Sequence, residues 1–239
     1  MNTFTENQKI GEVVTKFPNA AEIFQDYRLD FCCGGDRPLK VAIQEDGQEG
    51  KEKEILEKVN KEYEKFLESK EEDHQKDWTQ APLDELVDHI VNTHHAYLFE
   101  NLPKVSELAM KILRVHGVHH PELYDVYRLF HTIKMDLEAH LIKEETIQYP
   151  AIRKYLKTRS QEDLKKANEI IQELKEEHTG AGDILRELRK VTKDYEVPAN
   201  GCESYKLTYI KLQEMESDIF THVHLENNIL FPRLQQLEK

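Results

Sequence analysis

The sequence predicts an all-α protein, in which a small helical domain precedes a four-helix bundle. Glycine is scarce, with 9 residues in 239, which is below the usual share of about 7%. Apolar residues recur at steps of three and four over long segments, and no stretch sustains the alternation of a strand. Shifts in composition divide the chain into a domain at 1–70, a linker at 71–81 and the bundle at 82–239.

The first domain contains short helical patterns separated by Pro18, Pro38 and Gly47. Residues 20–29 form one such pattern, which leads into Cys32-Cys33-Gly34-Gly35; the glycines predict a sharp, exposed turn with a left-handed helix cap. A charged helix with an apolar stripe is predicted over 49–70. The segment 71–81 is polar and aperiodic, which is typical of a linker.

Four long helical patterns follow, at residues 87–112, 126–147, 164–188 and 212–229. Each carries an apolar stripe, so the four helices are expected to bury these stripes against one another in a bundle. Pro103 predicts a kink in the first helix. The second is expected to end near Pro150 or to continue bent through Tyr155, and the fourth to close at Phe231-Pro232.

One histidine interrupts each apolar stripe, and two of these histidines have a glutamate four residues later. The six residues are His95, His140, Glu144, His178, His222 and Glu226. A spacing of four places both side chains on one helical face, one turn apart. The segments HLIKEETIQYP and HVHLENNILFP also share His, Glu, an aromatic residue and Pro at equal offsets. The bundle therefore looks like two related helical hairpins, which together present four imidazoles and two carboxylates.

Six such residues at repeat spacing predict a metal centre. One buried histidine is commonly just hydrogen-bonded at the edge of a core, but unpaired carboxylates in a bundle core cost on the order of several kcal/mol each. Imidazole with carboxylate suits iron, and a thiolate set for zinc is absent. If the glutamates bridge two metals and the histidines divide equally, each metal has four protein ligands, five with a shared oxo or hydroxo group. An open position would remain, which favours a site that transforms a small molecule.

The metal-binding motifs of two other classes of di-iron protein do not match this sequence. The Glu-x-x-His motif of ferritin-like proteins is absent, because the residues three before the four histidines are Asn92, Leu137, Lys175 and Ile219. Oxygen-carrying hemerythrin has two histidines one turn apart on its third helix, whereas Leu174 and Gly182 flank His178 here. The missing imidazole argues against reversible oxygen carriage.

The remaining cysteines and histidines are less specific. Cys32 and Cys33 could be redox active or bind a metal transiently, and they could equally be small residues that fill a gap. Cys202 is interpreted as an ordinary loop thiol, and His116 as a solvated residue of a connection.

Composition excludes several classes of protein. A formal charge of -13 opposes nucleic-acid binding, and 3 cysteines cannot make a disulfide scaffold. No signal-peptide pattern and no apolar stretch near the ~20 residues of a membrane span is found. We therefore expect a soluble, cytoplasmic protein.

With these motifs in place, the chain resembles the RIC family, di-iron proteins associated with the repair of iron-sulfur clusters damaged by nitric oxide or oxidants. The matching segments are Leu29 to Gly35 with the paired cysteines, HIVNTHHAYLFENLP, HLIKEE, EEHTGAG and HVHLENNILFP. The resemblance implies a hemerythrin-like bundle with two non-haem irons bridged by Glu144 and Glu226, and damaged iron-sulfur proteins as partners. His116, in RVHG, matches a family histidine near the cavity and is kept as a secondary site residue.

The resemblance leaves the mechanism open. Iron could leave the site for a damaged cluster with the help of Cys32 and Cys33, or the irons could bind nitric oxide and reduce it, which would make the protein an enzyme. The alternative is a hemerythrin-like protein that binds or senses oxygen or nitric oxide without turnover. The electron donor, the client proteins, the domain arrangement and whether the chain forms a homodimer also stay open.

Overall fold

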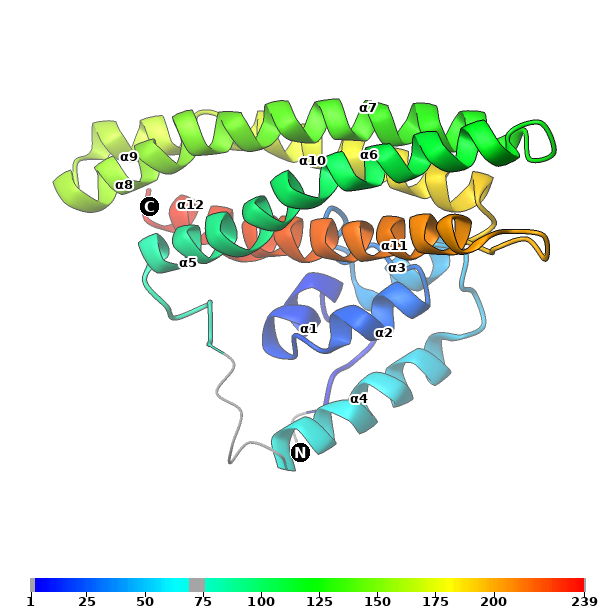
Figure 1. The fold of residues 1–239 in the computed structure, drawn as a ribbon. Coiled ribbons are helices and arrows are strands. Elements are labelled where there is room, and N and C mark those ends of the chain that lie inside the picture. The colour runs from blue at the N-terminus through cyan, green and yellow to red at the C-terminus, as the bar shows by residue number, and fades with distance from the viewer. Residues whose placement is uncertain (1–2, 69–75, 239) are drawn as a thin grey trace. The chain divides into compact units, whose positions relative to one another are not determined.

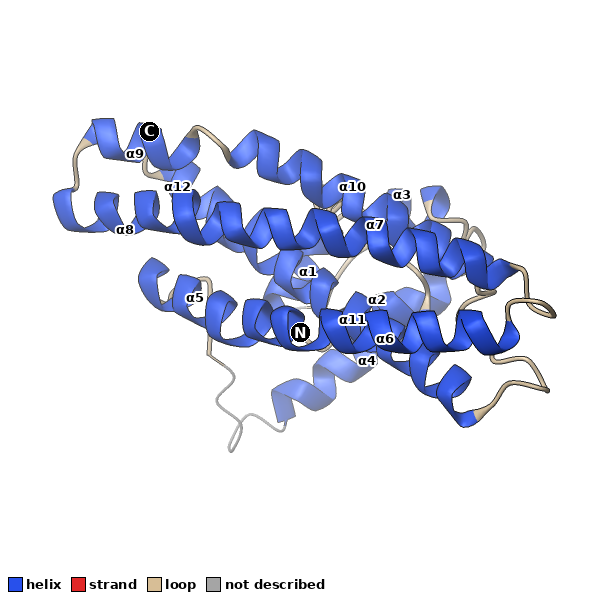
Figure 2. Cartoon of the chain, turned by 45° about the horizontal axis from the view of Figure 1, so that its top comes forward, coloured by secondary structure: helices blue, strands red, loops and turns tan. Residues whose placement is uncertain are grey.

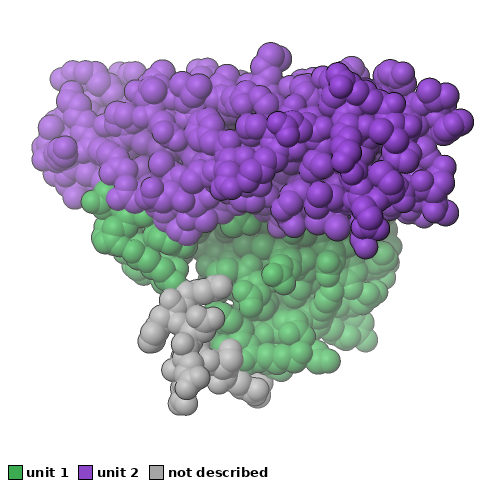
Figure 3. All heavy atoms as spheres, in the orientation of Figure 1, with its two compact units in different colours: residues 1–86, 220–237, 239 green, residues 87–219, 238 purple. Residues whose placement is uncertain are grey.

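The computed structural model describes residues 3–68 and 76–238, and every regular element in these ranges is a helix (Figures 1 and 2). The prediction of an all-α fold is confirmed. Of the proposed linker at 71–81, residues 71–75 lie outside the described residues, and the rest contains turns. The chain has two compact units, residues 1–86 with 220–237 and residues 87–219, which Figure 3 colours separately.

In its described residues, the first unit contains four N-terminal helices, the first residues of α5, the end of α11 and the last two elements of the chain. The N-terminal helices are α1 (Ile10–Lys16), α2 (Ala20–Asp26), α3 (Leu39–Glu45) and α4 (Glu52–Glu68). The last two elements are η3 (Leu225–Leu230) and α12 (Phe231–Gln236). Phe17, Phe24 and Phe31 are buried in the core of this unit. The charged helix predicted over 49–70 corresponds to α4, which begins at Glu52; residues 69–70 lie outside the described residues.

The second unit is the four-helix bundle. Its elements are the end of α5 (Leu83–Ile90), η1 (Val91–His95), α6 (Ala96–His116), α7 (Glu122–Lys143), η2 (Glu144–Gln148), α8 (Tyr149–Thr158), α9 (Gln161–Asn168), α10 (Ile171–Val191) and most of α11 (Glu203–His224). Helix α7 lies beside both α6 and α10 (Figure 1). Helix α11 is joined to α10 by the ion pair of Arg189 with Glu216 and to η1 by a hydrogen bond between His94 and Asp218.

Some helix boundaries differ from those expected. The pattern at 164–188 belongs to two helices, α9 and α10, which are separated at Glu169 and Ile170. Pro103 lies inside α6 and does not end it. The fourth pattern does not close at Phe231-Pro232, because Pro232 is the second residue of α12. A proline is tolerated in the first turn of a helix, where its missing N–H would have no partner within the helix.

Within the described residues, three wide π-helical turns interrupt the long helices, and each contains one of the six candidate ligands: His95 in η1, Glu144 in η2 and Glu226 in η3. Pro150 and Pro232 follow the second and third turns. Because proline cannot donate to the carbonyl four residues before it, the ordinary α-helical bond is missing there and a wider turn is favoured. π-Turns inside α-helices occur frequently at functional sites.

Candidate metal centre

Glu144 is the centre of a buried cluster in the second unit. It is fully buried, and its Oε1 lies 3.1 Å from Nε2 of His140 and 4.0 Å from Nε2 of His178. The two Nε2 atoms are 3.0 Å apart. These three separations leave a point about 2.0 Å from all three atoms, which is the usual length of a bond from a metal to imidazole or carboxylate. The three side chains therefore fit around one metal ion.

The other oxygen of Glu144 faces a different imidazole. Oε2 lies 3.2 Å from Nε2 of His95, whose side chain is 1% exposed. The Tyr149 hydroxyl is 3.4 Å from the same nitrogen. One oxygen of this carboxylate thus faces His140 and His178 and the other faces His95, so Glu144 could contribute to the binding of two metal ions.

Two of these imidazoles are oriented by further carboxylates. Nδ1 of His95 lies 2.8 Å from Glu145, and Nδ1 of His140 lies 2.6 Å from Glu177. When Nδ1–H donates to a carboxylate, Nε2 is left to ligate a metal. Partial burial alone would raise the pKa of Glu177, but its bonds with Lys143 and His140 hold that pKa below the usual range. This outer layer of carboxylates supports the ligand geometry.

Sequence reasoning missed Glu145, Glu177 and Tyr149 as members of the site. Tyr149 is the aromatic residue of the repeat, but its counterpart is Phe231, which has no hydroxyl. The repeat therefore did not indicate a role for the Tyr149 hydroxyl. Glu145 and Glu177 each adjoin a ligand residue in a strongly charged sequence, where an acidic residue usually indicates a solvated face.

His222 and Glu226 belong to the first unit, one turn apart at the junction of α11 and η3. Nε2 of His222 lies 3.4 Å from Oε2 of Glu226, and the two side chains are 1% and 0% exposed. Between them, burial lowers the pKa of His224 to about 4, so its imidazole is neutral near pH 7, and its Nδ1 lies 3.1 Å from the amide nitrogen of Asn228. This segment repeats the His-x-x-x-Glu arrangement of α7 and η2.

The paired cysteines do not form the exposed turn that the sequence predicted. Cys32 is only 3% exposed and Cys33 is half-buried. The hydrogen bond with the Cys33 thiol and burial raise the pKa of Cys32. The glycines do not form a left-handed cap but allow neighbouring side chains to approach the backbone closely. A Cβ on Gly34 would lie 2.5 Å from the Arg37 guanidinium, and one on Gly35 would lie 2.3 Å from Oδ1 of Asn228.

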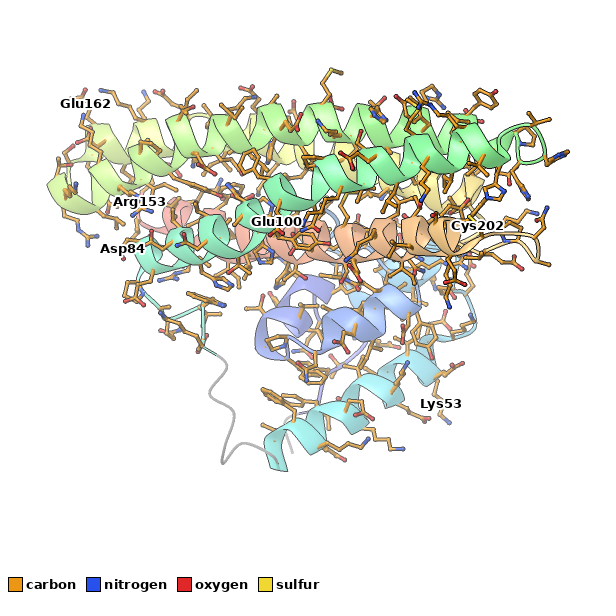
Figure 4. All side chains as sticks on the ribbon, in the orientation of Figure 1. Lys53, Asp84, Glu100, Arg153, Glu162 and Cys202 are labelled. Atoms are coloured by element: carbon orange, nitrogen blue, oxygen red, sulfur yellow. The ribbon has the colours of Figure 1, made fainter. Side chains whose placement is uncertain are left out.

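His116 and Cys202 meet away from the buried cluster. His116 ends α6, 21 residues after His95, a separation of about 30 Å along a helix. Its Nε2 lies 3.1 Å from Sγ of Cys202, the exposed thiol just before α11 (Figure 4). The structure thus does not bring His116 to the cluster around Glu144 in the second unit. It also gives Cys202 a partner 86 residues away, which no local pattern could indicate.

Comparison with known proteins agrees with this geometry. Residues 86–234 match the model of the hemerythrin HHE cation binding domain, and residues 6–63 match a domain of unknown function, DUF542. A probable iron-sulfur cluster repair protein of Haemophilus influenzae is 35% identical over 227 residues, which cover 95% of this chain and 96% of the relative. The iron-sulfur cluster repair protein YtfE of Escherichia coli O157:H7 is 32% identical, with 95% and 96% covered. This chain belongs to the RIC family of iron-sulfur cluster repair proteins.

The match extends over both parts of this RIC protein. All six candidate ligands fall within the range of the cation binding domain, and Cys32 and Cys33 fall within the other. The metal centre is therefore a cation site of the hemerythrin type. In the part of the chain that the structure describes, no helix has the length and apolarity needed to cross a membrane.

Proposed function

We propose that this RIC protein repairs damaged iron-sulfur clusters by means of two non-haem iron ions held in the bundle. The observation that carries the proposal is the two-sided carboxylate of Glu144, with Oε1 near His140 and Oε2 near His95. His178 joins the first set of ligands. By the internal repeat, His222 and Glu226 would complete the set of residues that hold the pair. Imidazole and carboxylate together favour iron.

The protein residues have separate tasks in this proposal. The six ligands hold the pair, and Glu145 and Glu177 orient the imidazoles of His95 and His140. Leu174 and Gly182, one turn on either side of His178, provide no further ligand and so leave a coordination position open. Iron at this site would supply exchangeable Fe²⁺ and a redox couple for a diatomic ligand such as nitric oxide.

The proposal assigns residues 1–70 to a dicysteine domain and 82–239 to the metal domain, with 71–81 between them. The ranges of the two family matches support this division. The partners would be damaged iron-sulfur proteins, as the names of the relatives suggest. The protein would act in the cytoplasm. Cys32 and Cys33 would assist the transfer of iron.

The direct test is the recovery of a nitrosylated iron-sulfur enzyme. The reduced, iron-loaded protein is incubated anaerobically with the inactivated enzyme, and the return of activity and the release of nitrous oxide are measured. We expect recovery well above that given by the same concentration of free Fe²⁺ and thiol. If the fully loaded protein binds nitric oxide reversibly but restores no activity, the repair proposal is wrong and the binding alternative is favoured.

A further inference from the structure

Three potential metal ligands converge in the dicysteine loop of the first unit. Ligand atoms of Asp30, Cys32 and Cys33 all lie within 4.8 Å of one another. The two sulfur atoms are 3.8 Å apart, and Sγ of Cys32 lies 3.5 Å from Oδ1 of Asp30. In a tetrahedral site with metal–sulfur bonds of about 2.3 Å and metal–oxygen bonds of about 2.0–2.1 Å, the corresponding edges are about 3.8 Å and about 3.5 Å.

We propose that Asp30, Cys32 and Cys33 form a second metal site, a tetrahedral site for one divalent ion with its fourth position open. Two thiolates and a carboxylate suit ions of intermediate softness such as Fe²⁺, Co²⁺ and Zn²⁺, and not Mg²⁺ or Ca²⁺. The inference rests on the proposed function, because it specifies where an iron ion would be held outside the bundle site. A disulfide would require the sulfurs to close to about 2.05 Å, whereas a metal ion requires little movement of either sulfur.

The Asp30 side chain is held in position for this role. Its Oδ1 accepts the backbone N–H groups of Cys32 and Cys33, at 3.2 Å and 2.9 Å. Arg37 donates to the Asp30 carbonyl oxygen at 3.0 Å, and the Asp46 carboxylate accepts from both the Asp30 N–H and Arg37. The carboxylate thus lies beside both sulfurs before any ion binds, so little ordering is needed on binding.

The other side of the loop is fixed to the segment that carries Glu226. The Asn228 amide donates to the carbonyl oxygens of Phe31 and Cys32, each at 3.2 Å. Its Oδ1 occupies the space that a Cβ on Gly11 or Gly35 would need. Because Asn228 follows Glu226 by two residues on η3, the cysteine loop and this candidate bundle ligand are parts of one packed structure. Cys33 is only half-buried, so this end of the loop is partly accessible to solvent.

Titration of the metal-free protein with Co²⁺ under anaerobic conditions tests the site. Thiolate ligands give Co²⁺ an intense charge-transfer absorption in the near ultraviolet. The candidate ligands of the bundle are imidazoles and carboxylates, which do not give this absorption. We expect the amplitude of this absorption at saturation to correspond to one thiolate-bound Co²⁺ per chain, in addition to the Co²⁺ bound in the bundle. It should disappear in Cys33→Ser, while the weaker visible bands of Co²⁺ in the bundle and the helical circular dichroism are retained.

Matched variants identify the ligands. Asp30→Asn keeps an oxygen that can accept from the two N–H groups but removes the carboxylate charge, and should weaken the thiolate-reporting site at least about tenfold. Asp36→Asn makes the same change of charge at an exposed position of the same loop and should have no effect, like Cys202→Ser. The proposal is overturned if the bundle fills without thiolate absorption, if Asp30→Asn binds as the parent does, or if the absorption is lost in Cys202→Ser. Since none of these readouts uses repair activity, a failure of the repair assay would leave them unaffected.

Discussion

Replacing Glu144 by alanine should remove metal from the bundle site and lower the melting temperature of the iron-loaded protein by about 10 °C. A ligand present at a thousand times its dissociation constant stabilises the folded state by about 4 kcal/mol, and each kcal/mol shifts the midpoint by about 2–4 °C in a chain of this size. Glu144 is the residue whose two oxygens reach both His140 and His95, so its loss affects both metal positions.

The measurements are elemental analysis and thermal unfolding before and after chelation. Chelation should lower the midpoint of the parent protein and leave that of Glu144→Ala almost unchanged. Glu138→Ala is the matched control, because this α7 glutamate pairs with Lys134 and has a side chain 38% exposed. A Glu144→Ala protein that retains its full metal content would show that the site has been assigned wrongly.

The second large effect is expected at the ion pair that joins α10 to α11. Arg189 donates through Nε to both oxygens of Glu216, at 2.8 Å and 2.9 Å, and Glu216 is 1% exposed. Arg189→Ala leaves a buried carboxylate without its cation, which costs about 3–5 kcal/mol. Combining it with Glu216→Leu should restore most of this stability, because an apolar pair buries no charge. Urea unfolding measures both free energies.

The loss should also depend on pH. Burial raises the pKa of Glu216 even though Arg189 acts to lower it, and removing Arg189 raises that pKa further. A carboxyl group with a raised folded pKa binds more protons when folded than when unfolded, so stability falls as the pH rises above the unfolded value. Arg189→Ala should therefore be more destabilising at pH 7 than at pH 5. Lys190→Ala, which removes an exposed pair with Glu187, is the control; an equal loss in both variants would contradict the account.

The bundle and its candidate ligands could be predicted from two features of the sequence, the histidines within apolar stripes and the internal repeat. A histidine within an apolar stripe, as at His178, is a local exception that the helical period makes visible. The repeat then related His140 with Glu144 to His222 with Glu226. In the structure, Glu144 and the three histidines of the second unit lie close together, as this pattern implied.

Other features could not be predicted, for physical reasons that differ between residues. Pro150 favours the π-turn at Glu144 but does not by itself predict it, because Pro103 lies within α6 without such a turn. Cys32 is buried because Asn227 and Asn228, some 195 residues later, hold its carbonyl, and such a distant contact leaves no periodic trace. From the sequence, Asp30 is interpreted as an ordinary turn residue, and only the structure shows its carboxylate close to both sulfur atoms.

The central claim is that the bundle holds a pair of iron ions. Native mass spectrometry of the Cys32→Ser/Cys33→Ser protein, loaded with iron and kept anaerobic, tests it without a contribution from the loop site. The account predicts two irons per chain, both lost on addition of Glu144→Ala. A single iron per chain, or none, would contradict it.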